Sequence, residues 1–124
     1  MMIKNILLIA LGGGLGSVIR YLSCISTGKI WPSKTFLATF IVNIIGCFLI
    51  GLLMGYLQKT ETDGNTLKLL LVTGFCGGFT TFSAFGLENY NLLQSQNYIT
   101  SLLYIVSSIV VGIAFVVIGI YLTK

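Results

Sequence analysis

Charged residues are scarce in this sequence. Charged residues make up 8% of its 124 positions, whereas an average globular protein has roughly 25%. Apolar residues make up 56% of the chain, and the mean hydropathy is +0.99. So little polar surface cannot cover a water-soluble particle of this size. The composition therefore excludes a secreted disulfide scaffold and most soluble enzymes, and it indicates a protein of the lipid bilayer.

Histidine is absent, and the three cysteines (Cys24, Cys47 and Cys76) show no CxxC spacing. We therefore expect no cysteine–histidine metal site and interpret the cysteines as small apolar packing groups. The seven basic residues are scattered and form no patch, so nucleic acid is not expected as a partner. No nucleophile, base and orienting group can be assembled, so we do not expect an enzyme.

The apolar stretches have the length of membrane spans. A bilayer core about 30 Å thick needs roughly 20 apolar residues in a helix. Residues 35–58, 69–87 and 89–123 carry no charge, and the last run is interrupted by the polar turn 94–97. A further apolar run begins at Asn5 and is interrupted only by Arg20. We predict an all-α membrane protein, a single transmembrane domain over 1–124, with helices at roughly 5–27, 36–57, 67–93 and 100–122.

The first run also resembles a signal peptide, because Lys4 precedes a short apolar stretch. It has no A-x-A-like cleavage site, so we expect a membrane helix instead. With four spans, both termini and the middle loop share one face of the membrane. That face carries Lys4, Lys59, Lys68 and Lys124, and the other carries Lys29, Lys34 and the end of the first span with Arg20. Such a balance barely decides orientation, so we predict insertion both ways, which allows an antiparallel dimer.

One amide lies in the middle of the second predicted span. Polar side chains are costly in hydrocarbon and are functional hypotheses by default. Asn43 follows Thr39 by four residues, so the two share a helix face. The sequence leaves two interpretations open, an interhelical hydrogen bond or a functional group.

Two charges are expected at one depth. Arg20 follows Gly12 and Gly16 at steps of four, and Glu88 lies near the end of the third span. The small residues favour close helix packing, and Arg20 is either a snorkelling anchor or the positive lining of an anion entrance. We hypothesise a salt bridge between Arg20 and Glu88.

The third span is predicted to be broken. Gly77-Gly78 falls at its middle, where a helix former is expected, and Thr80 and Thr81 beside it are good helix N-caps. Irregular backbone at membrane depth must be buried in protein or line a cavity, where freed carbonyls hold cations. The alternative is a continuous helix in which Gly74 and Gly78 form a close-packing motif.

Aromatic and hydroxyl side chains accompany this segment. Phenylalanines recur at positions 75, 79, 82 and 85. Such a stripe serves packing or lipid contact, but ring edges are positively polarised and, beside Asn43 and the hydroxyls of Thr81 and Ser83, could replace water around a small anion. In the fourth span Ser101, Tyr104 and Ser108 share one face. They indicate either backbone-bonded hydroxyls or a polar track.

Three stretches together carry a family resemblance: GGGLGSVIRY at 12–21, NIIGCF at 43–48 and GFCGGFTTFSAF at 74–85. With them the whole chain resembles the Fluc fluoride channels, also called CrcB proteins. The resemblance implies passive fluoride export across the bacterial inner (plasma) membrane by an antiparallel dual-topology homodimer with two pores. Two positions depart from the family pattern. Ala38 stands where the family commonly has glycine, and Gly112 stands where some members have serine.

The resemblance also implies roles for individual residues. Phe82 and Phe85 are similar to the aromatic residues that contact fluoride by their ring edges, and Asn43 to the pore-lining amide. Gly77 and Thr80 are similar to the residues whose carbonyls hold a central structural sodium ion between the subunits. The remaining matches are Ser83, Tyr104 and Ser108, similar to the polar track, and Arg20, similar to the vestibule cation.

The nearest rival is a small four-helix dual-topology exporter of cationic compounds. A proton-coupled exporter of this kind needs a deep carboxylate, and Glu88 lies toward the end of its span. The absence of histidine removes the commonest proton carrier near neutral pH. A non-transporting membrane scaffold would explain the glycines but not the predicted break beside Asn43.

Overall fold

Four helical spans make up the described part of the protein. The computed structural model describes residues 1–60 and 64–124, and the regular elements in these ranges are all helices. Three spans are single helices: α1 (Met2–Ile30), α2 (Phe36–Lys59) and α6 (Tyr98–Thr123). The fourth is the composite Asn65–Gln94. Each is long and apolar enough to cross a bilayer, so the chain is a multi-pass membrane protein.

The composite span consists of four consecutive pieces. These are α3 (Gly64–Leu67), the π-helix η1 (Lys68–Cys76), α4 (Gly77–Phe79) and α5 (Ser83–Gln94). The chain leaves helical geometry after Phe79, and Thr80 is extended, with φ −87° and ψ 158°. The break therefore lies at residues 80–82, between α4 and α5.

The position of the break corrects the sequence analysis. Gly77 and Gly78 are helical, although their pairing suggested the break. Gly78 lies against Gly13 of α1, because a methyl group added to Gly78 would come within 3.0 Å of the Gly13 Cα. The alternative interpretation, close packing through Gly74 and Gly78, is thus also correct in part. Of the two expected N-caps, Thr81 accepts a hydrogen bond from the Ala84 N–H at 3.2 Å, whereas Thr80 does not cap α5.

Each predicted range lies inside the observed span, which extends one to three residues further at most ends. The extra turns contain Lys4, Lys29 and Lys59. Lysines at helix ends reach toward the membrane surface along their aliphatic stems. A helix can therefore continue past the last apolar residue.

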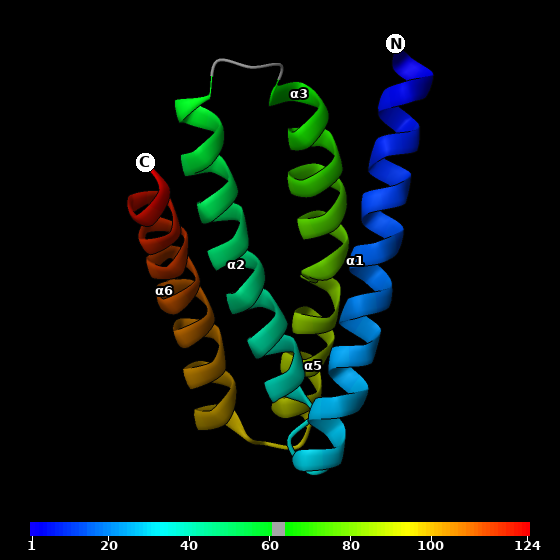
Figure 1. Ribbon diagram of the computed structural model, residues 1–124. Coiled ribbons are helices and arrows are strands. Elements are labelled where there is room, and N and C mark those ends of the chain that lie inside the picture. The colour runs from blue at the N-terminus through cyan, green and yellow to red at the C-terminus, as the bar shows by residue number, and fades with distance from the viewer. Residues whose placement is uncertain (61–63) are drawn as a thin grey trace.

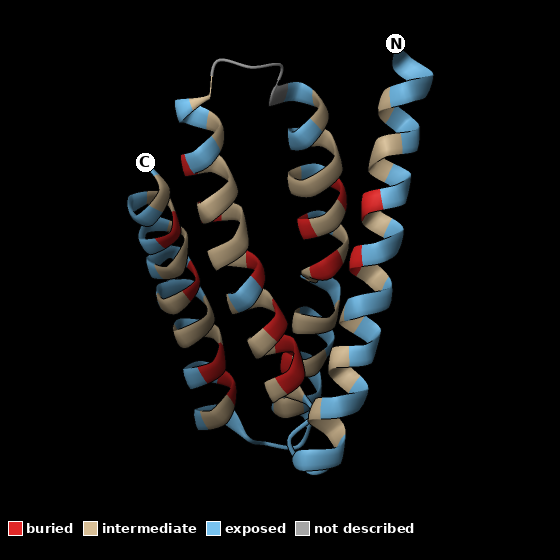
Figure 2. Cartoon of the chain, in the orientation of Figure 1, coloured by how far each residue is buried: buried red, intermediate tan, exposed pale blue. Residues whose placement is uncertain are grey.

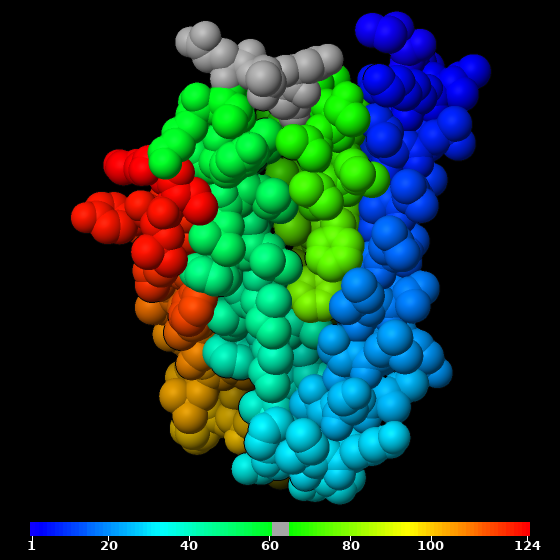
Figure 3. Space-filling view, viewed as in Figure 1, coloured from blue at the N-terminus to red at the C-terminus, as the bar shows by residue number. Residues whose placement is uncertain are grey.

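The spans form two close pairs (Figure 1). α2 packs mainly on α6, and α1 packs mainly on η1 and α4. The two termini lie at one end of the bundle, and the α1–α2 and α5–α6 connections lie at the other. In the space-filling view α2 occupies the space between α6 and η1 (Figure 3). Buried residues lie on the facing sides of the helices, and the outer sides are exposed (Figure 2), as expected for surfaces that meet lipid.

Glycines bring both pairs together. The Cβ of a residue replacing Gly16 would lie 2.8 Å from the Phe79 nitrogen, and one replacing Gly119 would lie 2.7 Å from the Leu52 nitrogen. Close backbone approach through small residues is the usual way in which membrane helices gain van der Waals contact. The small residues noted in α1 therefore hold the first half of the broken span in place.

The connection between α5 and α6 is a tight turn. Asn97 N–H donates to Leu92 O at 2.8 Å and Gln96 N–H donates to Leu93 O at 3.1 Å. This pairing is a Schellman motif, in which Gln96, with φ 63°, takes the left-handed position that glycine usually fills. The turn fixes the start of α6 beside the end of α5.

Candidate functional site

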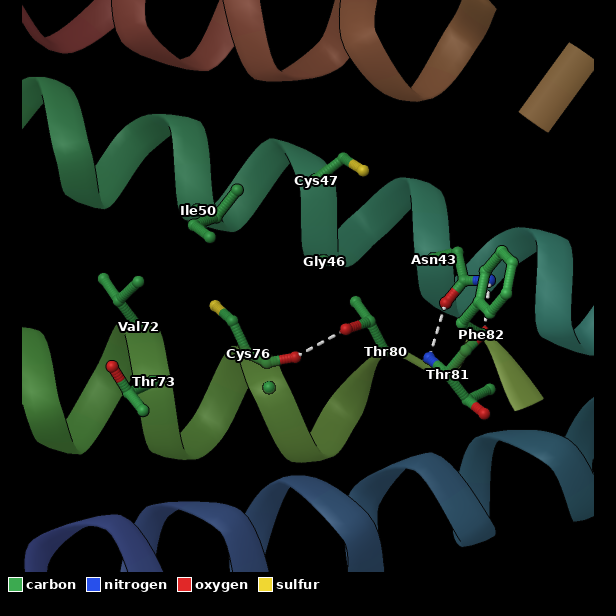
Figure 4. Close-up of a pocket in the computed structure, with 11 residues that line it drawn as sticks. Asn43, Gly46, Cys47, Ile50, Val72, Thr73, Cys76, Thr80, Thr81 and Phe82 are labelled. Atoms are coloured by element: carbon green, nitrogen blue, oxygen red, sulfur yellow. Dashed lines mark hydrogen bonds between the residues drawn. The ribbon is translucent and has the colours of Figure 1, made fainter. Parts of the chain in front are cut away.

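The break is bound by the side chain of Asn43. Its Nδ2 donates to Thr81 O at 3.0 Å, and its Oδ1 accepts from Thr81 N–H at 2.8 Å (Figure 4). One amide thus satisfies both backbone groups of Thr81. The interhelical hydrogen bond considered for Asn43 is therefore present, and Nδ2 retains a second hydrogen.

Other groups at the break are satisfied from within the span and from α1. Thr80 N–H and Thr80 Oγ1 both donate to Cys76 O, at 3.0 and 2.8 Å. Arg20 Nε donates to Gly78 O at 3.1 Å, and Ser17 Oγ approaches the same oxygen at 3.5 Å. Buried carbonyls without donors are costly. α1 and α2 therefore stabilise the break from two sides.

The expected salt bridge between Arg20 and Glu88 is wrong. Arg20 contacts the Gly78 carbonyl, and the Glu88 carboxylate accepts from Thr39 Oγ1 at 2.6 Å and from Tyr104 OH at 2.8 Å. The hydroxyl donors come from α2 and α6, which lie beside α5. The sequence predicted a similar depth in the membrane for both charges, but their side chains bond to different groups.

The four carbonyls of residues 77–80 lose the donors that a continuous helix would provide, and the Arg20 side chain replaces the donor to one of them, Gly78 O. In an α-helix, Gly77 O would accept from Thr81 N–H, and Thr80 O from Ala84 N–H. Here Thr81 N–H donates to Asn43, and Ala84 N–H donates to Thr81 Oγ1. Gly77 and Thr80 are the two residues predicted to hold a cation. Their oxygens are therefore available ligands of the kind that coordinates sodium at unwound helices.

Gly77 and Thr80 line one cavity together with Asn43, Thr81 and Phe82. The cavity has a volume of about 490 Å³ and lies between α2 and the broken span. Figure 4 shows Asn43 and Phe82 at one end and the first half of the span along the side. Phe82 is 82% exposed. The ring is therefore open to lipid or to another polypeptide beside the bundle.

The four phenylalanines do not form one stripe. The break separates Phe75 and Phe79, whose rings stack at 5.7 Å, from Phe82 and Phe85, whose centroids lie 5.8 Å apart. Phe85 meets the Tyr104 ring edge to face at 5.0 Å. Phe79 and Phe82 both border the break, but only the second pair reaches α6, through the contact of Phe85 with Tyr104. The packing interpretation therefore fits the first pair, in which Phe79 is only 4% exposed.

The polar face expected on α6 is present. Tyr104 bonds Glu88, and Ser101 Oγ donates to Asn89 Oδ1 at 2.9 Å. The Ser108 Oγ is buried and has no partner in the described part of the chain. Near the break, the hydroxyls of Thr81 and Ser83 lie 3.3 Å apart. The polar groups thus line α6 and the start of α5.

Sequence reasoning assigned no role to two residues of this arrangement. Thr39, 3% exposed, contributes a donor to Glu88. Its position four residues before Asn43 was a usable signal. Asn89, 7% exposed, donates to Phe85 O at 2.9 Å and joins α5 to Ser101 of α6. Its position between Glu88 and Asn91, at the polar end of the span, gave no distinct signal.

Comparison with known proteins gives the chain a family. The family model described as "CrcB-like protein, Camphor Resistance (CrcB)" matches residues 7–120. The chain belongs to the CrcB family. It is 46% identical to a protein of Azobacteroides pseudotrichonymphae over 99% of this chain and 98% of that one. It is 48% identical to a protein of Flavobacterium psychrophilum over 98% of both chains. A third relative, from Gloeothece citriformis, is 47% identical over 97% of both.

Each of these relatives is named "Fluoride-specific ion channel FluC". The resemblance inferred from the sequence is thereby confirmed. Membership of an ion-channel family also confirms that the chain is not an enzyme, and, with its four spans, that it is a multi-pass protein of the cell membrane.

Proposed function

We propose that this CrcB-family chain forms a fluoride-selective channel that exports fluoride passively across the inner membrane. The observation that carries the proposal is its identity, along nearly the whole chain, to proteins named fluoride-specific ion channels. An inside-negative potential favours anion exit by about 2.3 kcal/mol per 100 mV, so export needs no other energy source. The rival exporter of cationic compounds has no support among these relatives.

The break supplies groups suited to a small hard anion. The ring edges of Phe82 and Phe85 are positively polarised, and the second Nδ2 hydrogen of Asn43 remains available. The hydroxyls of Thr81, Ser83 and Ser108 extend these groups toward and along α6, where Tyr104 continues the polar face although its own hydroxyl hydrogen is donated to Glu88. Together they replace part of the water shell without a fixed counter-charge, so fluoride is not held irreversibly. Arg20, near the break, supplies positive potential at the vestibule.

Two copies in antiparallel orientation complete the channel. The exposed Phe82 and the open cavity beside it support a second copy, because four helices cannot enclose a polar pathway in lipid. Closed two-fold symmetry is the commonest arrangement of identical subunits. The near-even basic charge of the two ends supports insertion both ways. A homodimer of this kind has two equivalent pores.

A structural sodium ion on the two-fold axis belongs to the same proposal. The carbonyls of Gly77 and Thr80 lack their helical donors and adjoin the cavity that the second copy would cover. Each subunit would contribute these two oxygens. The ion supplies positive charge between the two breaks, which makes the adjacent anion paths more attractive.

Flux from liposomes tests the function. We expect the purified protein to release fluoride and retain chloride, as followed with ion-selective electrodes. Phe82→Ile removes the polarised ring edge but keeps an apolar side chain, and it should lower the fluoride rate about tenfold, which corresponds to about 1.4 kcal/mol in the barrier. Tyr121→Ile, at an aromatic side chain that is 73% exposed near the far end of α6, is the control.

Two results would contradict the proposal. Equal release of chloride and fluoride would remove the selectivity, and release of neither ion would remove the channel. Normal fluoride flux in Phe82→Ile would contradict the proposed role of the Phe82 ring but not the proposed channel function.

A further inference from the structure

A second polar cleft lies at the end of the bundle where α1 meets α2 and α5 meets α6. Its volume is about 380 Å³. Polar side chains form much of its lining, which includes Lys34, Glu88, Asn91, Ser95 and Thr100. It contains none of the residues that line the cavity at the break. We call it the Lys34 cleft.

The Lys34 cleft is continuous with buried polar groups inside the bundle. Glu88 lines it, and the same carboxylate accepts hydrogen bonds from Thr39 and Tyr104. Those two residues are only 3% and 4% exposed. One turn further along α6 lies the buried Ser108 hydroxyl, which has no partner in the described residues. Polar groups thus extend from the surface of the cleft toward the break.

The two charges of the Lys34 cleft balance formally, so the case for an anion depends on where each charge lies, with Lys34 exposed and the Glu88 oxygens bonded to groups inside the bundle. Lys34 is its one cationic lining residue and Glu88 its one acidic residue, among the residues described. Both oxygens of Glu88 accept hydrogen bonds from hydroxyl groups of other helices, and neither bond involves the Lys34 ammonium. The first turn of α2, which borders the cleft, has no acidic residue. The exposed ammonium is therefore free to raise the local concentration of small anions.

We propose that the Lys34 cleft is a mouth of the anion path, where Lys34 concentrates fluoride before entry or after exit. This inference rests on the proposed channel function. It assigns the cleft a small hard anion as ligand, held loosely by the ammonium and the neighbouring amide and hydroxyl groups. The competing account is that Lys34 only anchors the helix end at the lipid headgroups.

Single-channel fluoride conductance in planar bilayers of neutral lipid tests the charge. Lys34→Gln should lower the conductance roughly threefold at about 20 mM ionic strength, and Lys34→Glu should lower it further. The difference should vanish near 1 M, where the screening length is about 3 Å. Lys29→Gln removes an exposed lysine at the same end of the bundle but outside the cleft, and should leave the conductance unchanged.

A thiol-labelling experiment tests the path independently of Lys34. In a background with the three native cysteines replaced by alanine, Ser95→Cys places a thiol in the cleft, and Ser26→Cys places one on an exposed face of α1. Both variants are labelled in detergent before reconstitution. A sulfonate-bearing reagent at position 95 should lower fluoride conductance more than an ammonium-bearing reagent of similar size, and neither should act at position 26.

The outcomes separate this inference from the proposed function. If the unsubstituted protein conducts fluoride but Lys34→Glu matches it at low ionic strength, the inference is overturned and the channel stands. The same holds if neither reagent changes conductance at position 95. If the unsubstituted protein conducts no fluoride, both the function and the mouth are overturned.

Discussion

Asn43 determines the local structure of a segment 38 positions away in the sequence. By binding both Thr81 N–H and Thr81 O, its amide prevents Thr81 from donating to Gly77. The deviation from the helix is therefore enforced by α2 and not only by the glycines of the broken span. A polar side chain in lipid is tolerated here because its partners are backbone groups that would otherwise be unsatisfied.

We expect Asn43→Ala to destabilise the protein by about 1–3 kcal/mol, the usual cost of leaving a buried hydrogen-bonding group without its partner. It should also depress fluoride flux, because Thr81 is no longer fixed. Thermal unfolding in detergent and liposome flux measure the two effects. Asn5→Ala, near the start of α1, is the control, and the proposed role of Asn43 is wrong if both variants behave alike.

Individual contacts were the least predictable features. The sequence identified Asn43, Arg20 and Glu88 as the polar groups that need partners, because such groups are rare in spans. It did not identify the partners. Arg20 donates to a backbone carbonyl and Glu88 accepts from two hydroxyls, which depends on how the helices are rotated about their axes.

At the scale of elements, the spans could be predicted because their length and apolarity follow from bilayer thickness. The break was predicted in the correct span but a few residues too early. Paired glycines signal either a break or close packing, and here Gly78 packs on α1 while residues 80–82 leave the helix. The π-helical winding of η1 was not predicted, since its hydrogen-bond register has no distinct hydrophobic pattern.

Two glycines of α1 allow a matched test of that packing. An added methyl at Gly16 would meet the backbone of Phe75 and Phe79, whereas at Gly14 nothing lies within 4 Å. Gly16→Ala should therefore destabilise the protein by about 1–3 kcal/mol through overpacking. Gly14→Ala should be neutral or stabilising by up to about 1 kcal/mol, because alanine is the better helix former.

Thermal unfolding of the two glycine variants in the same detergent is the measurement. A lower melting temperature for Gly14→Ala than for Gly16→Ala would contradict the assignment of the α1–α4 contact. Fluoride flux of Gly16→Ala provides a second readout, since displacement of α4 moves the Gly78 carbonyl away from Arg20.

At the scale of the whole molecule, composition predicted a membrane protein, the lengths of the apolar runs predicted four spans, and the motifs predicted the family. The assembly depends on surfaces that a single chain leaves open, of which the cavity beside Phe82 is the clearest. Antiparallel pairing therefore remains a proposal supported by symmetry and by charge balance between the two ends.

Orientation in cells is directly measurable. In the background without native cysteines, Lys124→Cys at the C-terminus should react with a membrane-impermeant thiol reagent in about half of the molecules of intact cells, and in all after permeabilisation. Adding Ser95→Lys and Asn97→Lys raises the positive charge of the opposite end and should shift the labelled fraction strongly away from one half. If the reagent labels all or none of the Lys124→Cys protein that lacks the two added lysines, dual topology is ruled out.

The hydrogen bonds that close the break also have a temporal order. Arg20 and Asn43 both precede Thr81 along the chain, so the ribosome delivers their helices to the membrane before residues 80–82 emerge. The unpaired peptide groups of that segment can therefore form hydrogen bonds with α1 and α2 as they insert, and they do not enter the lipid without partners. This order of synthesis avoids an intermediate in which the broken span lies in the membrane without α1 and α2. A circular permutant in which the broken span is synthesised first should therefore insert less efficiently.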